Sequence, residues 1–296
     1  MRIGSTFAAV VLLVSLAVGR LFALEMIHGT WSIEIGHGPE SVQLTLQTGS
    51  DAHFQDVSSF DIQASELGIA SALATPGQSD VKFTISREAG SIAGSGTVKG
   101  GTGNGTFVFT PSEAFRTHMR DRGYGDLDAH QEFTATMLDL TTGFVDRIVA
   151  AGYPHVSFGK LITFRALGVD GDFIHDMRAT FAATDIDADE MTSLRALKVT
   201  SAYVSQMRDS GFTVPSPNDA VQLRALNVNE AYVRDLSAAG YDHLSSEELV
   251  QLRALGIDAA FIKRVEVHGF SHLPIDKLIQ LKALNVISAS FQGRHA

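Results

Sequence analysis

The first part of the chain alternates apolar and polar residues, which is the pattern of half-buried β-strands. Four segments show it most clearly: TWSIEI (30–35), SVQLTLQ (41–47), VKFTISRE (81–88) and GTFVFTP (105–111). The stretches REAGS (87–91) and KGGTGNGT (99–106) are typical of turns. Residues 24–111 are therefore predicted to form a small antiparallel β-domain, either a sandwich or a partly closed barrel, with one helical turn around Ser65 to Ser71.

From Ser112 onward the pattern changes to short helices that repeat. A glycine followed by an aromatic residue recurs at steps of about 29 residues, as at Gly211-Phe212 and Gly240-Tyr241. A basic residue followed by Ala-Leu recurs at the same step, at Arg165, Arg195, Arg224, Arg253 and Lys282. Such a period predicts helical hairpins that stack on one another. We expect an α-solenoid-like array of about six ~29-residue units over residues 112–296, and an α+β fold class with segregated halves.

One unit indicates how its helices begin and end. In LSSEELVQLRALGI (244–257), Ser245 and Glu248 have the spacing of a capping box at a helix N-terminus. Gly256 is placed to end this helix in the left-handed conformation, and Asp258 is placed to cap the next helix. The apolar stripe predicted for the first helix consists of Leu249, Leu252 and Leu255. Helices of about ten residues are unstable alone, so the units must pack together.

Residues 1–23 have the features of a secretory signal peptide, with an early Arg2, an apolar run and candidate cleavage sites after Gly19 and Ala23. An uncleaved signal anchor is the alternative, although Arg20 interrupts the apolar run before the ~20 residues that a membrane span needs. No later stretch approaches that length. We therefore expect an exported protein, periplasmic or extracellular, whose mature chain has no membrane span.

Composition narrows the kinds of partner and chemistry. The chain has 23 basic and 33 acidic residues, and removal of Arg2 and Arg20 leaves 21 basic residues and a net charge of −12. Such an acidic surface repels nucleic acid, which is not an expected partner. The lack of cysteine excludes disulfides, thiolate metal sites and a cysteine nucleophile. With no HExxH motif, P-loop or nucleophile elbow, neither a cofactor nor a catalytic residue is predicted.

The most regular charged feature is the row Arg165, Arg195, Arg224, Arg253 and Lys282. It is a candidate partner-binding surface, because a ladder of cations suits an acidic partner or a polyanionic polymer. Alternatively, each side chain lies along its own helix, pairs locally with an acidic residue and covers the core with its apolar stem. We favour the second interpretation because each basic residue stands between two predicted core residues, such as Leu252 and Leu255.

Three histidines share one position in the repeat, since His155, His243 and His272 each follow the glycine at the end of a second helix by three residues. Neighbouring helices pack about 10 Å apart, so His243 and His272 are candidates to contact a shared ligand or partner. The alternative is a loop-packing residue copied by duplication. We favour it because no carboxylate accompanies the histidines at a fixed spacing.

Gly29-Thr30-Trp31 contains the only tryptophan of the chain and resembles the first-strand signature of lipocalin-like barrels. The resemblance makes Trp31 a candidate ligand-binding residue of the β-domain, provided that an apolar cavity lies beside it. A core tryptophan is the alternative. It is favoured because a domain of about 85 residues is too short for an eight-stranded ligand barrel.

Taken together, GTWSIEI, VKFTISREAGSIAGSG, GTGNGTFVFTP and the LRALGV...YV..L.AAGY repeats resemble a family of largely uncharacterised bacterial envelope proteins. In that family a short β-domain precedes helical repeats, and similar repeats extend membrane metallopeptidases such as the antirepressors of β-lactam sensing. The present chain has neither their zinc motif nor their several membrane spans, so peptidase activity is not implied. The resemblance implies a role beside a sensor or an envelope assembly.

These observations favour an exported, non-enzymatic interaction or scaffold module that binds a protein or peptide partner through its repeat surface. Two alternatives stay open. The first is small-ligand binding by the β-domain in a lipocalin-like manner. The second is a hydrolase whose histidine and carboxylate residues cluster between the two halves of the chain.

Overall fold

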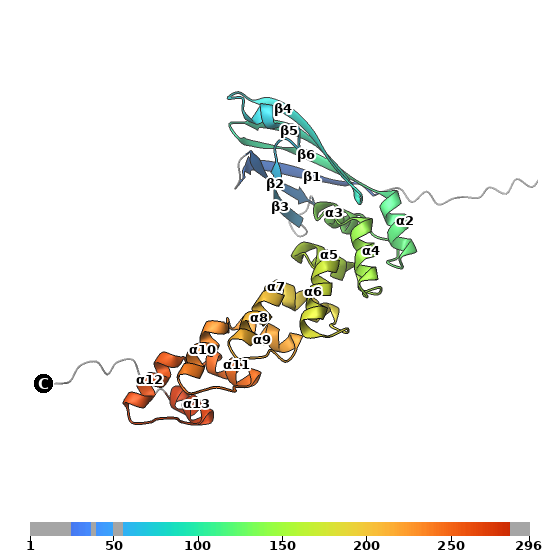
Figure 1. Ribbon diagram of the computed structural model, residues 1–296. Helices are drawn as coiled ribbons and strands as arrows, with labels where there is room; N and C mark the ends of the chain where they lie inside the picture. Colours follow the sequence, from blue (N-terminus) through green and yellow to red (C-terminus); the bar gives the residue numbers. More distant parts are fainter. Residues whose placement is uncertain (1–24, 37–39, 50–55, 285–296) are drawn as a thin grey trace, which may run out of the picture.

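The first half of the protein is one curled antiparallel sheet. The structure, a computed structural model, describes residues 25–36, 40–49 and 56–284, so the predicted signal peptide lies outside the described residues. The described strands are β1 (Ile27–Ile35), β2 (Ser41–Thr48), β3 (Asp56–Gln63), β4 (Ser79–Arg87), β5 (Gly90–Lys99) and β6 (Thr102–Pro111). They are ordered β3-β2-β1-β6-β5-β4, with antiparallel neighbours throughout. The sheet curls into a half-barrel (Figure 1), which confirms the partly closed barrel rather than the sandwich.

Helices cover the inner face of the sheet, where a sandwich would place its second sheet. A short helix, α1 (Ala70–Leu73), packs on β4 and β5, and α3 (Ala129–Met137) packs on β5 and β6. Phe133 of α3 stacks on Phe107 with ring centroids 5.9 Å apart and meets Phe109 edge-on at 5.3 Å. The sheet and the first part of the helical array therefore share one apolar core.

Beyond Pro111 the described chain is helical and forms two rows. Its helices are α2 (Glu113–Asp121), α3, α4 (Thr142–Ala150), α5 (Phe158–Leu167), α6 (Gly171–Phe181), α7 (Ala188–Ala196), α8 (Ser201–Asp209), α9 (Pro217–Ala225), α10 (Glu230–Ala238), α11 (Ser246–Ala254), α12 (Ala259–Val267) and α13 (Ile275–Ala283). The first helices of successive units, α5, α7, α9, α11 and α13, pack side by side, as do the second helices α2, α4, α6, α8, α10 and α12. The rows lead away from the sheet (Figure 1). Within the described ranges, no helix has the length and apolar character required to cross a membrane.

The helices begin and end where the sequence predicts. Ser245 and Glu248 form a capping box at α11, and Asp258 caps α12. At the end of α11 the Ile257 amide donates to the Leu252 carbonyl at 2.8 Å, which is the Schellman motif. The residue that this motif holds at positive φ is Gly168, Lys198, Asn227 or Gly256 in four of the units. The equivalent Asn285 lies outside the described residues.

Leu255 is a correction to the predicted apolar stripe. Leu249 and Leu252 are fully buried, but Leu255 is 38 % exposed. Each helical residue turns by about 100°, so a residue six positions after Leu249 points about 120° away from it. Ile257, which the Schellman motif folds back onto the helix, is buried instead.

Alanine substitutions at these two leucines test the assignment. Leu252→Ala should lower the free energy of unfolding by about 2–5 kcal/mol because it opens a cavity in the core. Leu255→Ala should lower it by less than about 1 kcal/mol because the side chain is already partly in water. Urea denaturation followed by circular dichroism measures both. Equal losses would show that Leu255 belongs to the core after all.

Candidate partner-binding surface

The predicted row of basic residues ties each unit to the unit before it. The arginine Nε donates to a backbone carbonyl at the end of the preceding first helix. The bonds run from Arg165 to Leu138 (2.9 Å), Arg195 to Leu167 (3.0 Å), Arg224 to Leu197 (3.3 Å) and Arg253 to Leu226 (3.2 Å), and from Lys282 Nζ to Gly256 (3.0 Å). The last turn of a helix has unpaired carbonyls and a partial negative charge. A cation at this position donates a hydrogen bond to one of these carbonyls and is attracted by the partial negative charge.

The same cations lie over aromatic rings in the second helix of the preceding unit. The distances to the ring centroid are 5.7 Å for Arg165 over Phe144, 4.9 Å for Arg195 over Phe173, 5.0 Å for Arg224 over Tyr203, 4.8 Å for Arg253 over Tyr232 and 4.6 Å for Lys282 over Phe261. A cation within about 6 Å of an aromatic face is attracted by the quadrupole of the ring. Each basic side chain therefore joins both helices of the preceding unit.

Two of these aromatic residues are tyrosines whose hydroxyl groups donate a hydrogen bond to the following unit. The Tyr203 hydroxyl donates to the Val228 carbonyl at 2.9 Å, and the Tyr232 hydroxyl donates to the Ile257 carbonyl at 2.6 Å. Both acceptors belong to the following unit. We call this combination of a backward-reaching cation and a forward-reaching hydroxyl the inter-unit clasp.

Burial of the clasp perturbs its tyrosines. Loss of hydration raises the pKa of Tyr203 and of Tyr232 to about 12, and the neighbouring arginine opposes this rise without cancelling it. The phenols are therefore neutral hydrogen-bond donors over the whole physiological pH range.

The clasp changes the interpretation of the basic row. The side chains do not pair with acidic residues along their own helices, as we favoured, but reach across to the preceding unit. Arg165 also lies 3.5 Å from a carboxylate oxygen of Asp139, in the preceding unit. Arg195 is exposed and the other four are half-buried. Binding of an acidic partner by this row stays a prediction.

The three repeat histidines are exposed loop residues. His243 and His272 adopt left-handed backbone with φ of 56° and 51°, which histidine tolerates better than most non-glycine residues. The His272 ring lies against Gly240 of the preceding unit. In the described part of the chain, no group of three or more His, Asp or Glu residues is arranged to hold a metal ion. Contact of these three histidines with a ligand or partner stays a prediction.

Trp31 is a core residue of the sheet. It is 2 % exposed, and its indole N–H donates to the Ser95 carbonyl at 3.1 Å. A Cβ at Gly96 or Gly105 would lie only 2.6 or 2.7 Å from the indole, so these glycines make room for the ring. The hollow bordering Trp31 is otherwise lined by Thr30, Ser32, Thr45, Gln47, Asn104, Gly105 and Thr106. Most of these residues have polar side chains, whereas a lipocalin-like site needs a cavity lined by apolar side chains.

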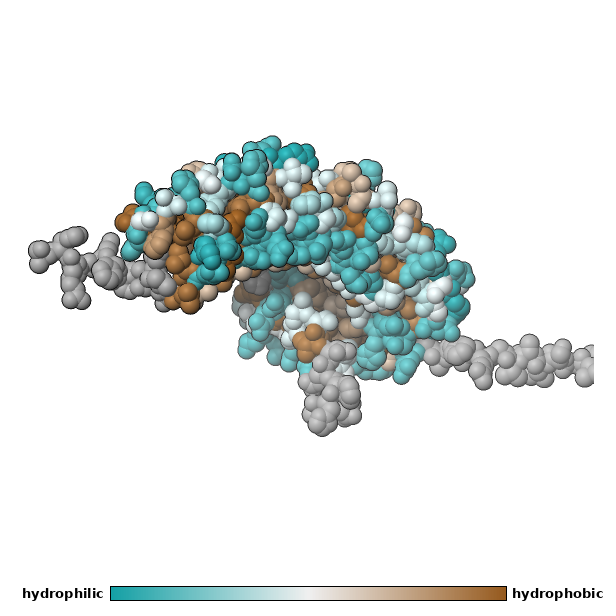
Figure 2. All heavy atoms as spheres, turned by 90° about the horizontal axis from the view of Figure 1, so that it is seen from below, coloured by the Kyte–Doolittle hydropathy of each residue, from teal (hydrophilic) through white to brown (hydrophobic). Residues whose placement is uncertain are grey.

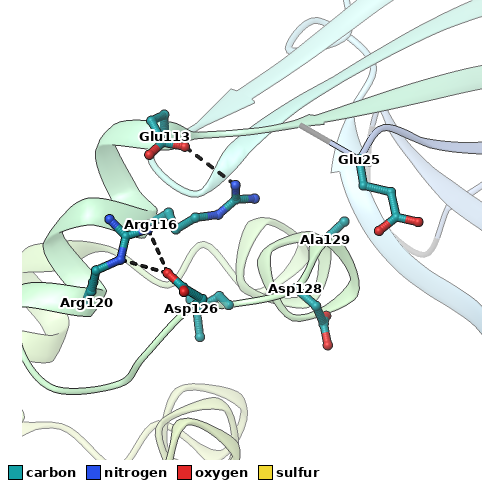
Figure 3. Close-up of a pocket in the computed structure, with 8 residues that line it drawn as sticks. Glu25, Glu113, Arg116, Arg120, Asp126, Asp128 and Ala129 are labelled. Carbon is teal, nitrogen blue, oxygen red and sulfur yellow. Dashed lines mark hydrogen bonds and ion pairs between the residues drawn. The ribbon is translucent and has the colours of Figure 1, made fainter. Parts of the chain in front are cut away.

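Charged residues at the junction of the two halves pair with one another. Arg116 of α2 holds the fully buried Glu132 of α3 through two hydrogen bonds of 2.9 and 3.0 Å. Burial raises the pKa of Glu132, and Arg116 opposes the rise. A cavity of about 170 Å³ lies beside the pair, where Arg116 also faces Glu113, and Arg120 bonds Asp126 (Figure 3). The carboxylates that Figure 3 shows in ion pairs are held by arginine. Histidine lies beside a carboxylate elsewhere, where His118 of α2 is 3.5 Å from Asp146 of α4 and Arg122 holds the same carboxylate. The hydrolase alternative stays a prediction.

A different face of the first helices points to solvent, and sequence reasoning missed it because its leucines have the spacing of core residues. We name it the outward ladder. It consists of Gln222, Ala225 and Leu226 at α9, Gln251, Ala254 and Leu255 at α11, and Gln280, Ala283 and Leu284 at α13. Leu226 is half-buried against the core, and the other eight are exposed. Leu284 is 72 % exposed. In Figure 2 apolar residues gather at the C-terminal end of the array.

These features define a protein in which a curled β-sheet continues into an α-solenoid with clasped units. Comparisons of the chain with protein-family models, with curated proteins and with solved structures found no match.

The forward hydrogen bond of the clasp can be removed alone. Tyr232→Phe should lower the free energy of unfolding by about 1–2 kcal/mol, because the Ile257 carbonyl loses its donor. Tyr124→Phe is the matched control, since the Tyr124 hydroxyl is buried without a hydrogen-bond partner in the described residues. Chemical denaturation should show no loss for the control. A Tyr232→Phe protein as stable as the wild type would contradict the clasp.

Alkaline pH tests the clasp in a second way. The pKa of Tyr203 and of Tyr232 is about 12 in the folded protein against 10 for an ordinary tyrosine. Their stabilisation is therefore complete below pH 10 and is lost as the pH rises toward 12, by about 2–3 kcal/mol per residue. The free energy of unfolding, measured by chemical denaturation at several pH values in this range, should fall less steeply with pH for the double variant Tyr203→Phe/Tyr232→Phe than for the wild type. Identical slopes would mean that these phenols are not buried as described.

Proposed function

We propose that the protein is an exported, non-enzymatic interaction or scaffold module of the bacterial cell envelope that binds a protein or peptide partner through its helical array. The observation that carries this proposal is the recurrence of the same solvent-facing residues along the outward ladder. Stacked helical units commonly bind partners through such extended surfaces.

A comparison within the array supports the proposal. The Gln, Ala and Leu of the outward ladder are identical in α9, α11 and α13, although they are exposed or partly exposed. The exposed residue one turn before the glutamine differs in each helix and is Asn218, Glu247 or Asp276. Stability tolerates most changes at exposed positions, so it does not require this identity. Contact of all three helices with one partner would explain why these residues are identical.

The location of the protein follows from the N-terminal segment. The predicted signal peptide places the array outside the cytoplasm, in the periplasm or beyond. An uncleaved signal anchor would tether it to the membrane with the array on the same side. The family resemblance points to a partner within a sensor or envelope assembly.

Site-specific photo-crosslinking in cells tests the proposed function. A photoreactive residue at Gln251, on the outward ladder, should give one discrete adduct with an envelope protein. The matched control places the same residue at Lys263, which is exposed on α12 in the other row of helices. The adduct should be absent from the control.

Equal crosslinking from the two positions, or none from either, would contradict binding through the array. Mass spectrometry of the adduct identifies the partner. The mass of the uncrosslinked protein distinguishes a cleaved from an uncleaved N-terminus.

A further inference from the structure

The outward ladder has a chemical character of its own. Each step places an amide side chain, a methyl group and an apolar side chain in line along one helix and its C-cap. The Gln251 amide donates to Glu247 in its own helix, and the Gln280 carbonyl oxygen accepts from Lys277, and both bonds lie on the exposed surface. Exposed bonds of this kind are weak and exchange readily with another partner. The fold therefore leaves the amides available.

These residues fit the backbone of an extended peptide. A glutamine amide offers both a donor and an acceptor, which matches the N–H and C=O of a peptide unit. Ala254, with only a methyl group, lets a peptide backbone approach the helix. Leu255, 38 % exposed, offers an apolar contact beside it. One step of the ladder thus binds one peptide unit and one apolar side chain.

The spacing of the ladder selects the conformation of the peptide. Neighbouring helices such as α9 and α11 pack about 8–10 Å apart. A polyproline II helix has three residues per turn and rises about 3.1 Å per residue, so every third side chain returns to the same face after about 9.3 Å. Successive steps of the ladder can therefore receive every third residue of such a peptide.

The charge around the ladder determines which charge the peptide should carry. Glu247 is exposed one turn before Gln251 on the same helix face. Asp276 holds the same position before Gln280 and lies 3.8 Å from Lys277, so the uncompensated negative charge is at the α11 step. The basic residues Arg253 and Lys282 of the row are bonded to carbonyls of the preceding units. The chain as a whole has a net charge of −10. Basic residues in the peptide are therefore complementary to this face.

We propose that the outward ladder binds an extended cationic peptide that carries an apolar side chain at every third residue. This inference rests on the proposed function and names the chemistry of its partner.

The test measures fluorescence anisotropy of the full exported chain with a labelled peptide made of about four Leu-Pro-Lys repeats, in which proline favours polyproline II. Binding should be saturable. It should weaken for a peptide of the same composition with its leucines grouped together, and for one with glutamate in place of lysine. Leu255→Lys should weaken binding by about tenfold or more, as at an interface hot spot.

The control variant is Val267→Lys, which places the same charge on an exposed apolar residue in the other row of helices. It should bind the peptide as the wild type does. Circular dichroism confirms that both variants fold. Absent binding, or equal weakening by the two variants, would overturn the proposal.

Two further outcomes separate this proposal from the function on which it rests. If the crosslink from Gln251 captures a partner but the peptide does not bind, the partner chemistry is wrong and the proposed function stands. If sedimentation shows that Leu255→Lys separates two copies of the chain, the ladder is a self-association surface and the peptide proposal is overturned.

Discussion

A basic side chain that crosses from one unit to the one before it is the contact on which the array depends. The helices from α7 to α13 have nine residues each, about 14 Å, and helices of this length do not persist alone in water. Arg253 joins the end of α9 to the ring of Tyr232 on α10, and Tyr232 in turn bonds the chain beyond α11. Adjacent units are thereby fixed in position as well as packed.

The clasp also determines which surface is left for function. Because the cations are bonded within the chain, the regular charged row is first of all structural. The residues that follow it, such as Ala254 and Leu255, are turned to solvent by the same helix that aims Arg253 inward. One motif of three residues thus supplies an internal joint and an external surface. A solenoid can repeat both at every step.

Much of this fold could be predicted from the sequence because its signals are local. Ser245 and Gly256 mark the ends of α11 through rules that involve only neighbouring residues. The contact of Arg253 with Leu226 spans 27 residues and depends on how units stack, which local patterns do not specify. The prediction that Leu255 is buried was wrong because residues spaced three apart drift around the helix. A stripe with that spacing therefore stays on the buried face only over a short run. The helical cover of the sheet was missed because Phe133 lies in a segment that predicts only another array helix.

Hydrogen exchange on a protein with one clasp removed tests most directly whether clasps hold the units together. Arg224→Met with Tyr203→Phe removes the cation and the hydroxyl between the α7–α8 and α9–α10 units. The amides from α9 to α13 should then exchange faster, whereas those of the sheet and of α3 to α6 should keep their protection. Unchanged exchange throughout, or an equal loss in every element, would show that the units are held together by something other than the clasp.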